Sequence, residues 1–459
     1  MIELTPEQWR DKLLVDLRGR RAVIDLNYRY YRGDHPLPWA PAEVGDAYRS
    51  FLKMARSNWC RLVVKAPSER LRPVGMRFSG GDATGDTETW ETLWQGNRLD
   101  AECRMVHDSA LIARRGFALV WPRGEGQTPS ITPEHPSQVI VEFAPGDRRT
   151  RLAGLKTFDD VQSMQRFVTL WLPGAVYQWT APLTTVTGVP LAWSGWNDEA
   201  LNITEAADNP LGEVPLIEFV ADPALVGEPM SELDGGVIDI QDRINKTILD
   251  RLVTSNFSSF PQKWATGLEI PTDPETKQPI EPFKNAVDRV FYNENPEGSF
   301  GSFEASDLAP YIKSVESDIQ HLAAITRTPP HYLLGQSGAF PSGESLKSTE
   351  TGLVAKVLER RDSFTESWED VLRLALKAAG DPRSDDMAMS VLWKDPESRT
   401  QAEVMDAATK MQAVGVPYRE ILAFIGYSPT DISRLVEERK QDVADGLVPA
   451  APAAAVPAA

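Results

Sequence analysis

Two glycines between residues 338 and 345 have the spacing of a loop that binds nucleotide phosphates. The segment GAFPSGES, which begins at Gly338, matches the glycine spacing of a P-loop, whose free main-chain N–H groups cradle phosphate oxygens. The lysine that a P-loop places against the β- and γ-phosphates is replaced here by Glu344, whose charge repels them. No clear strand precedes the segment. We therefore interpret it as a structural loop.

The other chemically capable residues show no catalytic or metal-binding arrangement. His107, Asp108 and Ser109 are the residue types of a hydrolase triad, but consecutive helical residues point about 100° apart and cannot relay a proton in line. The five histidines and two cysteines lack the spacing of metal ligands. Thirteen tryptophans would suit a sugar cleft with paired carboxylates, yet most lie in apolar patterns typical of a core. We expect no catalytic site, no metal and no cofactor.

The length and charge of the chain limit its possible partners. With 459 residues and a mass of 50.9 kDa, the chain is long enough for two or more domains. A net charge of −18 argues against a surface that holds DNA by neutralising phosphates, but not against DNA passing nearby. Two cysteines indicate no disulfide framework and favour a cytoplasmic folding environment. Since no secretory signal and no run of eighteen apolar residues is found, we expect no membrane contact.

Periodicity predicts an α+β domain in the first half of the chain. A helix is predicted from Thr5-Pro6 to Gly33, a second one carrying Phe51 through Val63, and a third from Leu99 to Arg115. Arg70 to Phe78 reads as an edge strand. Short β-rich runs then indicate one antiparallel, partly solvated sheet that ends near residue 225, namely FALVWP, VIVEF, RFVTLWLP, AVYQWTA and PLIEFV.

The second half is predicted to be mainly helical. Apolar residues at three- and four-residue steps begin at Leu233 and resume at Asp307, which predicts a helical hairpin with a compact β insert at its tip. A Gly/Ser/Pro-rich loop then leads into one long helix, with Ser342 as its N-cap, a bend at Gly352 and a stop at Gly380. A strand that rejoins the first sheet and two or three short helices follow. An Ala/Pro-rich tail, expected to be disordered, ends the sequence.

The order of these pieces resembles the portal proteins of tailed bacteriophages, in the siphophage-type branch with a tunnel loop. The resemblance covers nearly the whole chain. It is carried by the strings YYRGDH, NWC with VV, RLRPVGMRF, LGEVPLIEFVADP, GGVIDIQDRINKTILDRL, TRTPPHYLLGQSGAFPSGESLKSTE and GVPYREILAFIGYSPTDI.

The resemblance implies a portal-like α+β fold with a mixed α/β wing, a helical-hairpin stem, a small β-containing clip, a long kinked helix with a tunnel loop, and an α-helical crown. The implied ranges are a wing at 1–231 with a returning strand at 381–395, stem helices at 232–258 and 306–328, a clip at 259–305, a tunnel loop at 329–345, a long wing helix at 346–380, a crown at 396–440 and a disordered tail at 441–459.

The resemblance also implies a function. The chain would form a homo-oligomeric ring, expected to be a dodecamer, at the portal vertex of the capsid in the virion, after assembly in the host cytoplasm. The terminase large subunit would pump double-stranded DNA through the channel, and the DNA would later leave by the same route. The other implied partners are the major capsid protein, the scaffold, and a head-completion or adaptor protein.

Candidate site residues follow from these assignments. The stretch GQSGAFPSG carries no charge, so it can touch moving DNA without holding it. The DNA-facing candidates are Gln336, Ser337, Gly338, Phe340, Ser342 and Lys347, although Lys347 can instead form a salt bridge with a neighbour such as Glu350. The partner-binding candidates in the clip are Lys263, Trp264 and Lys284. Two alternatives stay open: an adaptor or scaffold without a channel, and a carboxylate-dependent hydrolase.

Overall fold

A computed structural model describes most of the chain. The described residues are 4–36, 51–80, 85–124, 126–183, 202–259, 263–266, 299–302, 304, 306–334, 343–397, 401–427 and 429–447. They fall into two units, and each unit is discontinuous in the sequence. The first unit consists of Met1–His35, Asn58–Ile238 and Leu322–Ala459, and the second of Pro36–Ser57 and Asp239–His321. Helices and strands are both abundant, which confirms the predicted α+β class.

The first helix, α1 (Pro6–Arg32), has the ends that the sequence predicts. The Thr5 hydroxyl accepts a hydrogen bond from the main-chain N–H of Gln8, whose side chain in turn accepts one from the N–H of Thr5. This reciprocal pair satisfies two N–H groups that a helix start leaves without a partner. At the other end Gly33 has a φ of 79°, the left-handed conformation that glycine adopts without strain.

The strands of the first unit form two large antiparallel sheets, so the prediction of one sheet is wrong. A five-stranded sheet has the order β4-β5-β6-β7-β8, and a three-stranded sheet the order β3-β2-β9. Their strands are β2 (Arg115–Trp121), β3 (Ser130–Glu134), β4 (Val139–Ala144), β5 (Asp147–Asp160), β6 (Gln165–Trp171), β7 (Ala175–Pro182), β8 (Asn202–Asp208) and β9 (Leu216–Val220).

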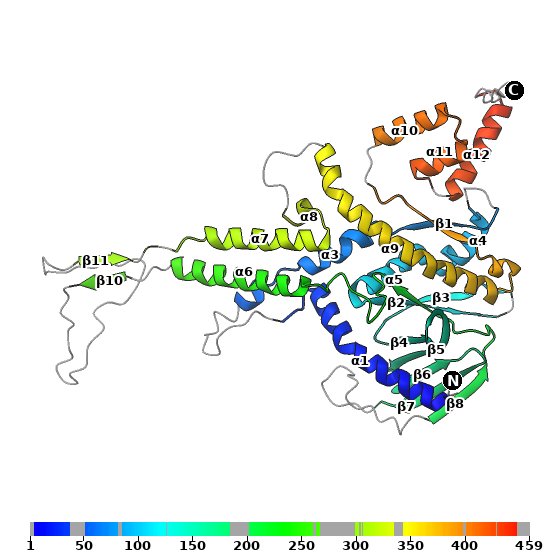
Figure 1. Ribbon diagram of the computed structural model, residues 1–459, viewed down its shortest axis with the longest axis horizontal. Coiled ribbons are helices and arrows are strands. Elements are labelled where there is room, and N and C mark those ends of the chain that lie inside the picture. The colour runs from blue at the N-terminus through cyan, green and yellow to red at the C-terminus, as the bar shows by residue number, and fades with distance from the viewer. Residues whose placement is uncertain are drawn as a thin grey trace. The chain divides into compact units, whose positions relative to one another are not determined.

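The five-stranded sheet is covered on both faces, because successive side chains of a strand point to opposite sides. On β4, Ile140 packs with Leu13 and Leu17 of α1, whereas Val139 and Val141 pack with Phe117 and Leu216 of the smaller sheet. Gly154 on β5 permits this close approach, since a Cβ there would lie 2.6 Å from the side chain of Val214. The layers therefore follow in the order α1, five-stranded sheet, three-stranded sheet (Figure 1).

The long helix α9 (Gly343–Ala378) covers the other face of the three-stranded sheet (Figure 1). Its predicted apolar stripe is buried, including Leu353, Val357, Phe364, Trp368 and Leu372. The helix begins at Gly343, directly after the predicted N-cap position 342 and three residues before the implied range 346–380, and it runs through Gly352 without interruption. Gly380 has a φ of 75° and follows the last turn, which confirms the predicted stop.

The packing around α9 is completed by three shorter helices, α3 (Trp59–Ser68), α4 (Thr87–Leu93) and α5 (Leu99–Ala113). A single helix carrying Phe51 through Val63 was predicted, and this is wrong. Residues 51–54 are helical, the helix breaks before Asn58, and the Asn58 side chain accepts a hydrogen bond from the N–H of Arg61 as the N-cap of α3. Asparagine at this position favours a helix start over a helix interior.

The predicted returning strand exists but does not join either large sheet. Strand β12 (Ser390–Trp393) pairs with β1 (Pro73–Arg77) in a separate two-stranded antiparallel ribbon. The expectation that it rejoins the first sheet is therefore wrong, although its pairing with the predicted edge strand is confirmed.

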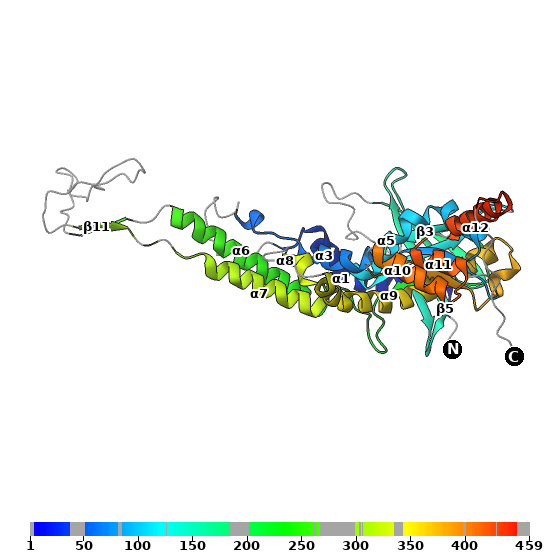
Figure 2. The same cartoon turned by 90° about the horizontal axis from the view of Figure 1, so that it is seen from above.

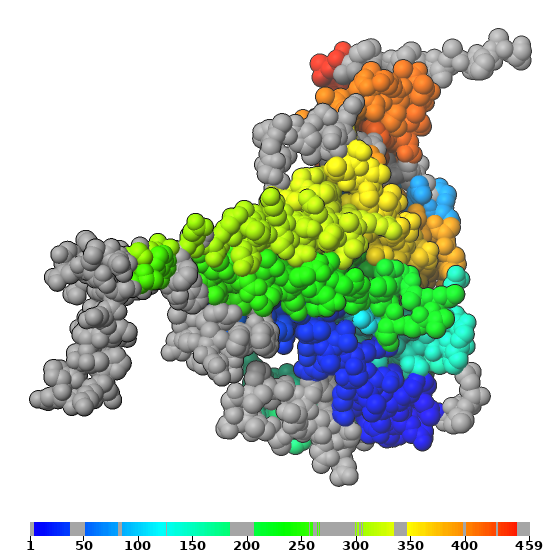
Figure 3. Space-filling model, turned by 60° about the vertical axis from the view of Figure 1, so that its left-hand side comes forward, coloured from blue at the N-terminus to red at the C-terminus, as the bar shows by residue number. Residues whose placement is uncertain are grey.

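Three helices follow the ribbon: α10 (Gln401–Ala413), α11 (Tyr418–Ile425) and α12 (Pro429–Ala444). They gather in one lobe, coloured orange to red, next to the N-terminal half of α9 (Figure 3). Helix α12 extends to Ala444, so the first residues of the tail predicted to be disordered from 441 are helical. Residues 448–459 lie outside the described part of the chain.

The second unit contains most of two helices, α6 (Val237–Ser259) and α7 (Ala309–Thr326), which lie side by side in both views (Figures 1 and 2). Arg243 of α6 forms an ion pair with Asp318 of α7 at 2.8 Å. Helix α6 begins four residues after the predicted Leu233, because Gly235 and Gly236 have φ values of 68° and 91° that end the preceding turn. Between the helices, β10 (Lys263–Thr266) pairs with β11 (Ser299–Ser302).

Candidate functional site at the base of the loop 335–342

The predicted site residues fall into three groups. Six of them lie outside the described residues: Gln336, Ser337, Gly338, Phe340, Ser342 and Lys284. Lys347 lies near the start of α9 in the first unit, and Lys263 and Trp264 lie on β10 in the second unit. The structure thus describes the two ends from which the loop 335–342 departs: the short helix α8 (Pro330–Leu334) and the start of α9.

Trp264 is partly used in packing within the second unit. It stands opposite Gly301 on β11, and a Cβ on that glycine would lie 2.3 Å from the indole ring. The ring therefore lies across the facing backbone while 40% of the residue stays exposed. A half-exposed tryptophan of this kind has both a fixed position and free surface for a partner.

Lys347 is held by a residue that the sequence analysis did not consider. Its ammonium group forms an ion pair with Glu403 of α10, and the two side chains are 45% and 47% exposed. The alternative expectation that Lys347 forms a salt bridge is thus confirmed, but the partner is Glu403, because Glu350 pairs with Arg70. The Lys347–Glu403 pair lines a groove of about 490 Å³ between α9 and α10. Because it faces solvent, such a pair contributes less than about 1 kcal/mol and exchanges partners at little cost.

Arg70 joins the end of α8 to the first part of α9. Its guanidinium donates to the hydroxyl of Tyr332 at 2.7 Å and to Oε2 of Glu350 at 3.0 Å. Tyr332 closes the triangle by donating to Oε1 of Glu350 at 3.1 Å. Arg70 also donates to the carbonyl of Pro396 at 2.9 Å. Residues on both sides of the loop are therefore fixed to one arginine.

The electrostatics of this triangle favour the charged form of Arg70. Burial alone would lower the pKa of Arg70, but the hydrogen bonds to Glu350 and Tyr332 raise it above its ordinary value. Burial raises the pKa of Tyr332, so its hydroxyl keeps the proton that it donates to Glu350. Both shifts favour the protonated forms of Arg70 and Tyr332, which are the hydrogen-bond donors of the triangle.

A buried ion pair fixes the next turns of α9. The ammonium group of Lys356 donates to Oε2 of Glu232 at 2.7 Å and to the main-chain carbonyl of Thr326 at 2.7 Å. The Lys356 and Glu232 side chains are only 5% and 6% exposed. Burial alone would raise the pKa of Glu232, but Lys356 and Arg360 lower it below its ordinary value. Glu232 therefore stays ionised, and Lys356 satisfies a carbonyl at the end of α7.

The chain leaves α7 through a strained residue. Arg327, which follows Thr326, has a φ of 53°, a left-handed conformation that is uncommon for a residue with a side chain. Its guanidinium lies 3.3 Å from Oε1 of Glu359 on α9. This solvent-exposed pair links the turn before α8 to α9.

The hydrolase-like residues have separate partners. His107 accepts a hydrogen bond from Trp368, Asp108 pairs with Lys65, and the Ser109 hydroxyl bonds to that of Tyr28. The three side chains do not act on one another. Within the described ranges, no three His, Cys, Asp or Glu side chains gather as a metal ion would require. The same residues include no helix both long and apolar enough to cross a membrane.

Sequence reasoning did not single out Arg70, Tyr332, Lys356 or Glu232 as part of this site. Arg70 and Glu350 lie 280 positions apart, so only the fold brings them together. One signal was present in the sequence: Lys356 lies on the apolar stripe of α9, three positions after Leu353. A cation at a core-facing position usually has an acidic partner.

Comparison with known proteins identifies the class to which this fold and loop base belong. Residues 15–443 match the family described as phage portal protein, SPP1 Gp6-like. The chain therefore belongs to the phage portal protein family, a family of structural proteins of the virion that form oligomeric rings with capsid and tail partners. This confirms the resemblance and the portal-like fold class.

Individual relatives agree with the family. The portal protein of Mycobacterium phage D29 is 25% identical over 455 residues, which are 95% of this chain and 89% of the relative. The portal protein of Mycobacterium phage L5 is 25% identical over 413 residues, which are 86% of this chain and 80% of the relative. Among solved structures, the neck of a native GTA particle computed with C12 symmetry is similar with 9% identity and a TM-score of 0.45, over 89% of this chain and 98% of that chain.

Proposed function

We propose that twelve copies of this chain form a ring around an axial channel at one capsid vertex. The terminase large subunit packages double-stranded DNA through this channel, and the DNA later leaves by the same route. The observation that carries the proposal is the match to the portal family over residues 15–443. Family membership favours this function over a channel-free adaptor or a carboxylate-dependent hydrolase, and we expect no catalytic activity.

The domain ranges are part of the proposal. We assign the wing to 1–231 and 381–395, the stem to 232–258 and 306–328, the clip to 259–305, the tunnel loop to 329–345, the long wing helix to 346–380 and the crown to 396–440. In support, the stem ranges contain α7 and all of α6 except its last residue, and the crown range contains α10, α11 and most of α12.

The loop base, which consists of α8 and the start of α9, suggests how a tunnel loop can change conformation while its two ends stay in place. The segment 335–342 carries no charge, so it can contact a passing DNA backbone without a deep electrostatic well. The Arg70 triangle and the Lys356–Glu232 pair fix the residues on either side. In this proposal the loop changes shape between two fixed ends, and Gln336, Ser337, Gly338, Phe340 and Ser342 face the DNA.

Lys347 would contact phosphates only transiently. Its ion pair with Glu403 is solvent-exposed, so a DNA phosphate can displace the carboxylate, and the carboxylate can then displace the phosphate. Competition of this kind prevents the cation from holding the DNA. In the clip, Lys263, Trp264 and Lys284 would contact the terminase or a head-completion protein, while the capsid protein and scaffold would contact other surfaces of the ring.

The decisive experiment is the solution mass of the purified chain together with electron microscopy of the same sample. Twelve copies of a 50.9 kDa chain weigh about 610 kDa, and a closed ring shows a central hole when viewed end on. We expect such rings, either from the chain alone or after addition of capsid and scaffold proteins. A chain that stays single under both conditions would contradict the proposal.

A further inference from the structure

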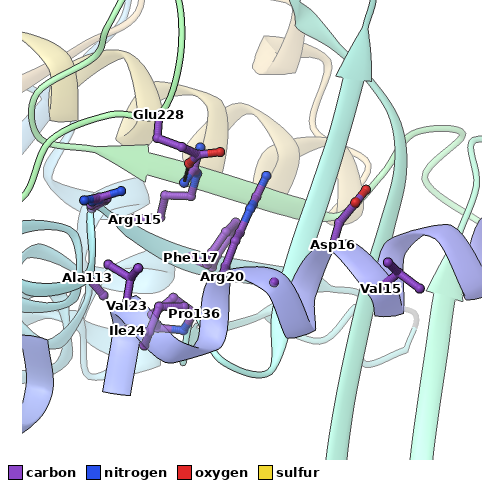
Figure 4. A pocket seen from close by; sticks show the side chains of 12 residues that line it. Val15, Asp16, Arg20, Val23, Ile24, Ala113, Arg115, Phe117, Pro136 and Glu228 are labelled. Carbon is purple, nitrogen blue, oxygen red and sulfur yellow. Dashed lines mark hydrogen bonds and ion pairs between the residues drawn. The ribbon is translucent and has the colours of Figure 1, made fainter. Parts of the chain in front are cut away.

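A pocket of about 590 Å³ lies between α1 and the start of β2, away from the loop base. Its lining includes Val15, Arg20, Val23, Arg115, Phe117 and Glu228. Figure 4 shows the Arg20 side chain extending from α1 toward the side of the pocket that Arg115 and Glu228 occupy. The pocket thus combines an apolar wall with a cluster of charges.

Most charges around this pocket are already paired. Arg114 donates two hydrogen bonds to Asp234, at 2.9 and 3.0 Å. Arg115 forms ion pairs with Glu218, at 2.5 Å, and with Glu228. Glu218, Glu228 and Asp234 are therefore committed to other arginines, whereas Asp16, one turn before Arg20 on α1, lines the pocket without forming an ion pair with Arg20 in the described part of the chain.

Arg20 is the exception. In the described part of the chain its guanidinium makes no hydrogen bond and no ion pair, although the residue is only partly exposed. Burial and the neighbouring positive charge of Arg115 lower the pKa of Arg20, and this effect outweighs the opposing attraction of the carboxylates of Glu218, Glu228 and Asp16. A guanidinium that is partly desolvated and lacks a partner is at a higher free energy than one bound to a carboxylate.

The surroundings of Arg20 are apolar and exposed. Val15 and Val23 line the pocket and are 60% and 37% exposed, and both lie on the outer side of α1. The loop that supplies Glu228 also carries Leu225 and Val226, which are 88% and 87% exposed. Exposed apolar side chains beside a partly buried, unpaired cation are typical of a surface that another protein covers.

We propose that this pocket receives a carboxylate side chain, flanked by apolar residues, from a neighbouring copy of the same chain. The inference rests on the proposed ring, because each copy in a ring contacts its neighbour through a surface that is not covered by its own chain. The chain supplies suitable partners, since its 66 acidic residues outnumber its 48 lysines and arginines. The apolar wall favours a protein side chain over a free phosphate, which would leave Val15 and Val23 exposed.

The test compares two arginine substitutions on the same helix. Arg20→Met removes the pocket cation, and Arg29→Met removes an exposed cation outside the pocket lining as the matched control. Sedimentation velocity over a range of concentrations measures assembly of each full chain, and thermal unfolding measures the stability of the unassembled chain. We expect R20M to need about tenfold higher concentration to assemble, with an unchanged or raised melting temperature, and R29M to match the wild type.

The outcomes test the proposed ring and the proposed contact at Arg20 separately. If R20M assembles like the wild type, or if its unassembled chain melts at a lower temperature, the contact is wrong and the ring stands. If the wild type forms open oligomers that R20M weakens, the contact stands and the closed ring is wrong. A wild type that stays single both alone and with capsid and scaffold proteins contradicts both.

A photo-crosslinking amino acid at Val23 identifies the occupant. We expect covalent dimers from assembled wild-type chain, joined to a peptide that contains Asp or Glu. Peptides without an acidic residue would overturn the proposal. A second result would also overturn the proposal: inorganic phosphate raises the melting temperature of the wild type but not of R20M, and assembly is unchanged. The pocket would then be a site for a free anion.

Discussion

The indole N–H of Trp368 donates a hydrogen bond of 2.8 Å to Nε2 of His107, which joins α9 to α5. The imidazole is completely buried and stacks on Phe364 with a centroid distance of 4.9 Å. Burial lowers the pKa of His107 to about 3. The ring is therefore neutral at physiological pH, and its acceptor nitrogen remains available to Trp368.

This relationship predicts a specific sensitivity to acid. The pKa of His107 is about 3 in the folded chain and near 6.5 when exposed, so the neutral ring contributes stability fully above pH 6.5. That contribution is lost as the pH falls from 6.5 toward 3, by up to about 1.4 kcal/mol per pH unit. Urea unfolding followed by tryptophan fluorescence should show a shallower acid dependence for His107→Gln than for the wild type.

The control for this experiment is His321→Gln, which removes an exposed histidine of the second unit. It should keep the wild-type acid dependence. Equal slopes for H107Q and the wild type would show that His107 does not titrate in the way that its burial requires.

The two lysine pairs of α9 should differ in their contribution to stability. Lys356→Met leaves the buried Glu232 with one cationic partner and leaves the Thr326 carbonyl without its donor. We expect the free energy of unfolding to fall by about 3 kcal/mol. Lys377→Met breaks a pair with Glu213 whose side chains are 46% and 38% exposed, and should cost less than about 1 kcal/mol. Chemical denaturation measures both values, and equal effects would contradict the buried role of Lys356.

Substitutions that weaken the loop base should reduce DNA packaging at a small cost to the stability of the fold. Tyr332→Phe removes one hydroxyl that both accepts from Arg70 and donates to Glu350, at a cost of about 1 kcal/mol. Arg70→Met removes the shared donor and should reduce the DNA content of purified particles more strongly. Arg123→Met, on the exposed turn after β2, should package like the wild type. A normal DNA content in R70M particles would show that the loop base plays no part in DNA transport.

A charge placed in the proposed tunnel loop should slow DNA movement. Ser337→Lys adds one cation per copy to a segment that has none, so each subunit gains a salt-dependent phosphate contact. We expect slower terminase-driven packaging in vitro and partial recovery at higher salt. Ser337→Thr keeps the segment neutral and should package at the wild-type rate. If S337K packages at the wild-type rate at every salt concentration, residue 337 does not face the DNA.

Local signals predicted the two long helices α1 and α9 well. Thr5, Pro6 and Gly33 gave both ends of α1, and the apolar stripe of α9 gave its buried face, because caps and periodicity depend on neighbours in sequence. The same reasoning missed β5 (Asp147–Asp160), whose first half is polar and exposed, since that strand is held by its neighbours in the sheet.

The candidate site was less predictable. The triangle of Arg70, Tyr332 and Glu350 joins residues 18 to 280 positions apart, and no local pattern marks such pairs. The separation into two sheets also depends on packing across β4, which sequence alternation alone does not reveal. The roles of the loop and clip residues remain predictions.

The ribbon of β1 and β12 has a consequence for folding during translation. Pro73 pairs with Trp393, so a strand made early on the ribosome waits for one made some 320 residues later. The buried face of α9 arrives equally late, although it covers strands that are translated first. The nascent first unit therefore exposes apolar surface until residues 353–393 have been translated, and only then can a subunit fold that is able to enter a particle.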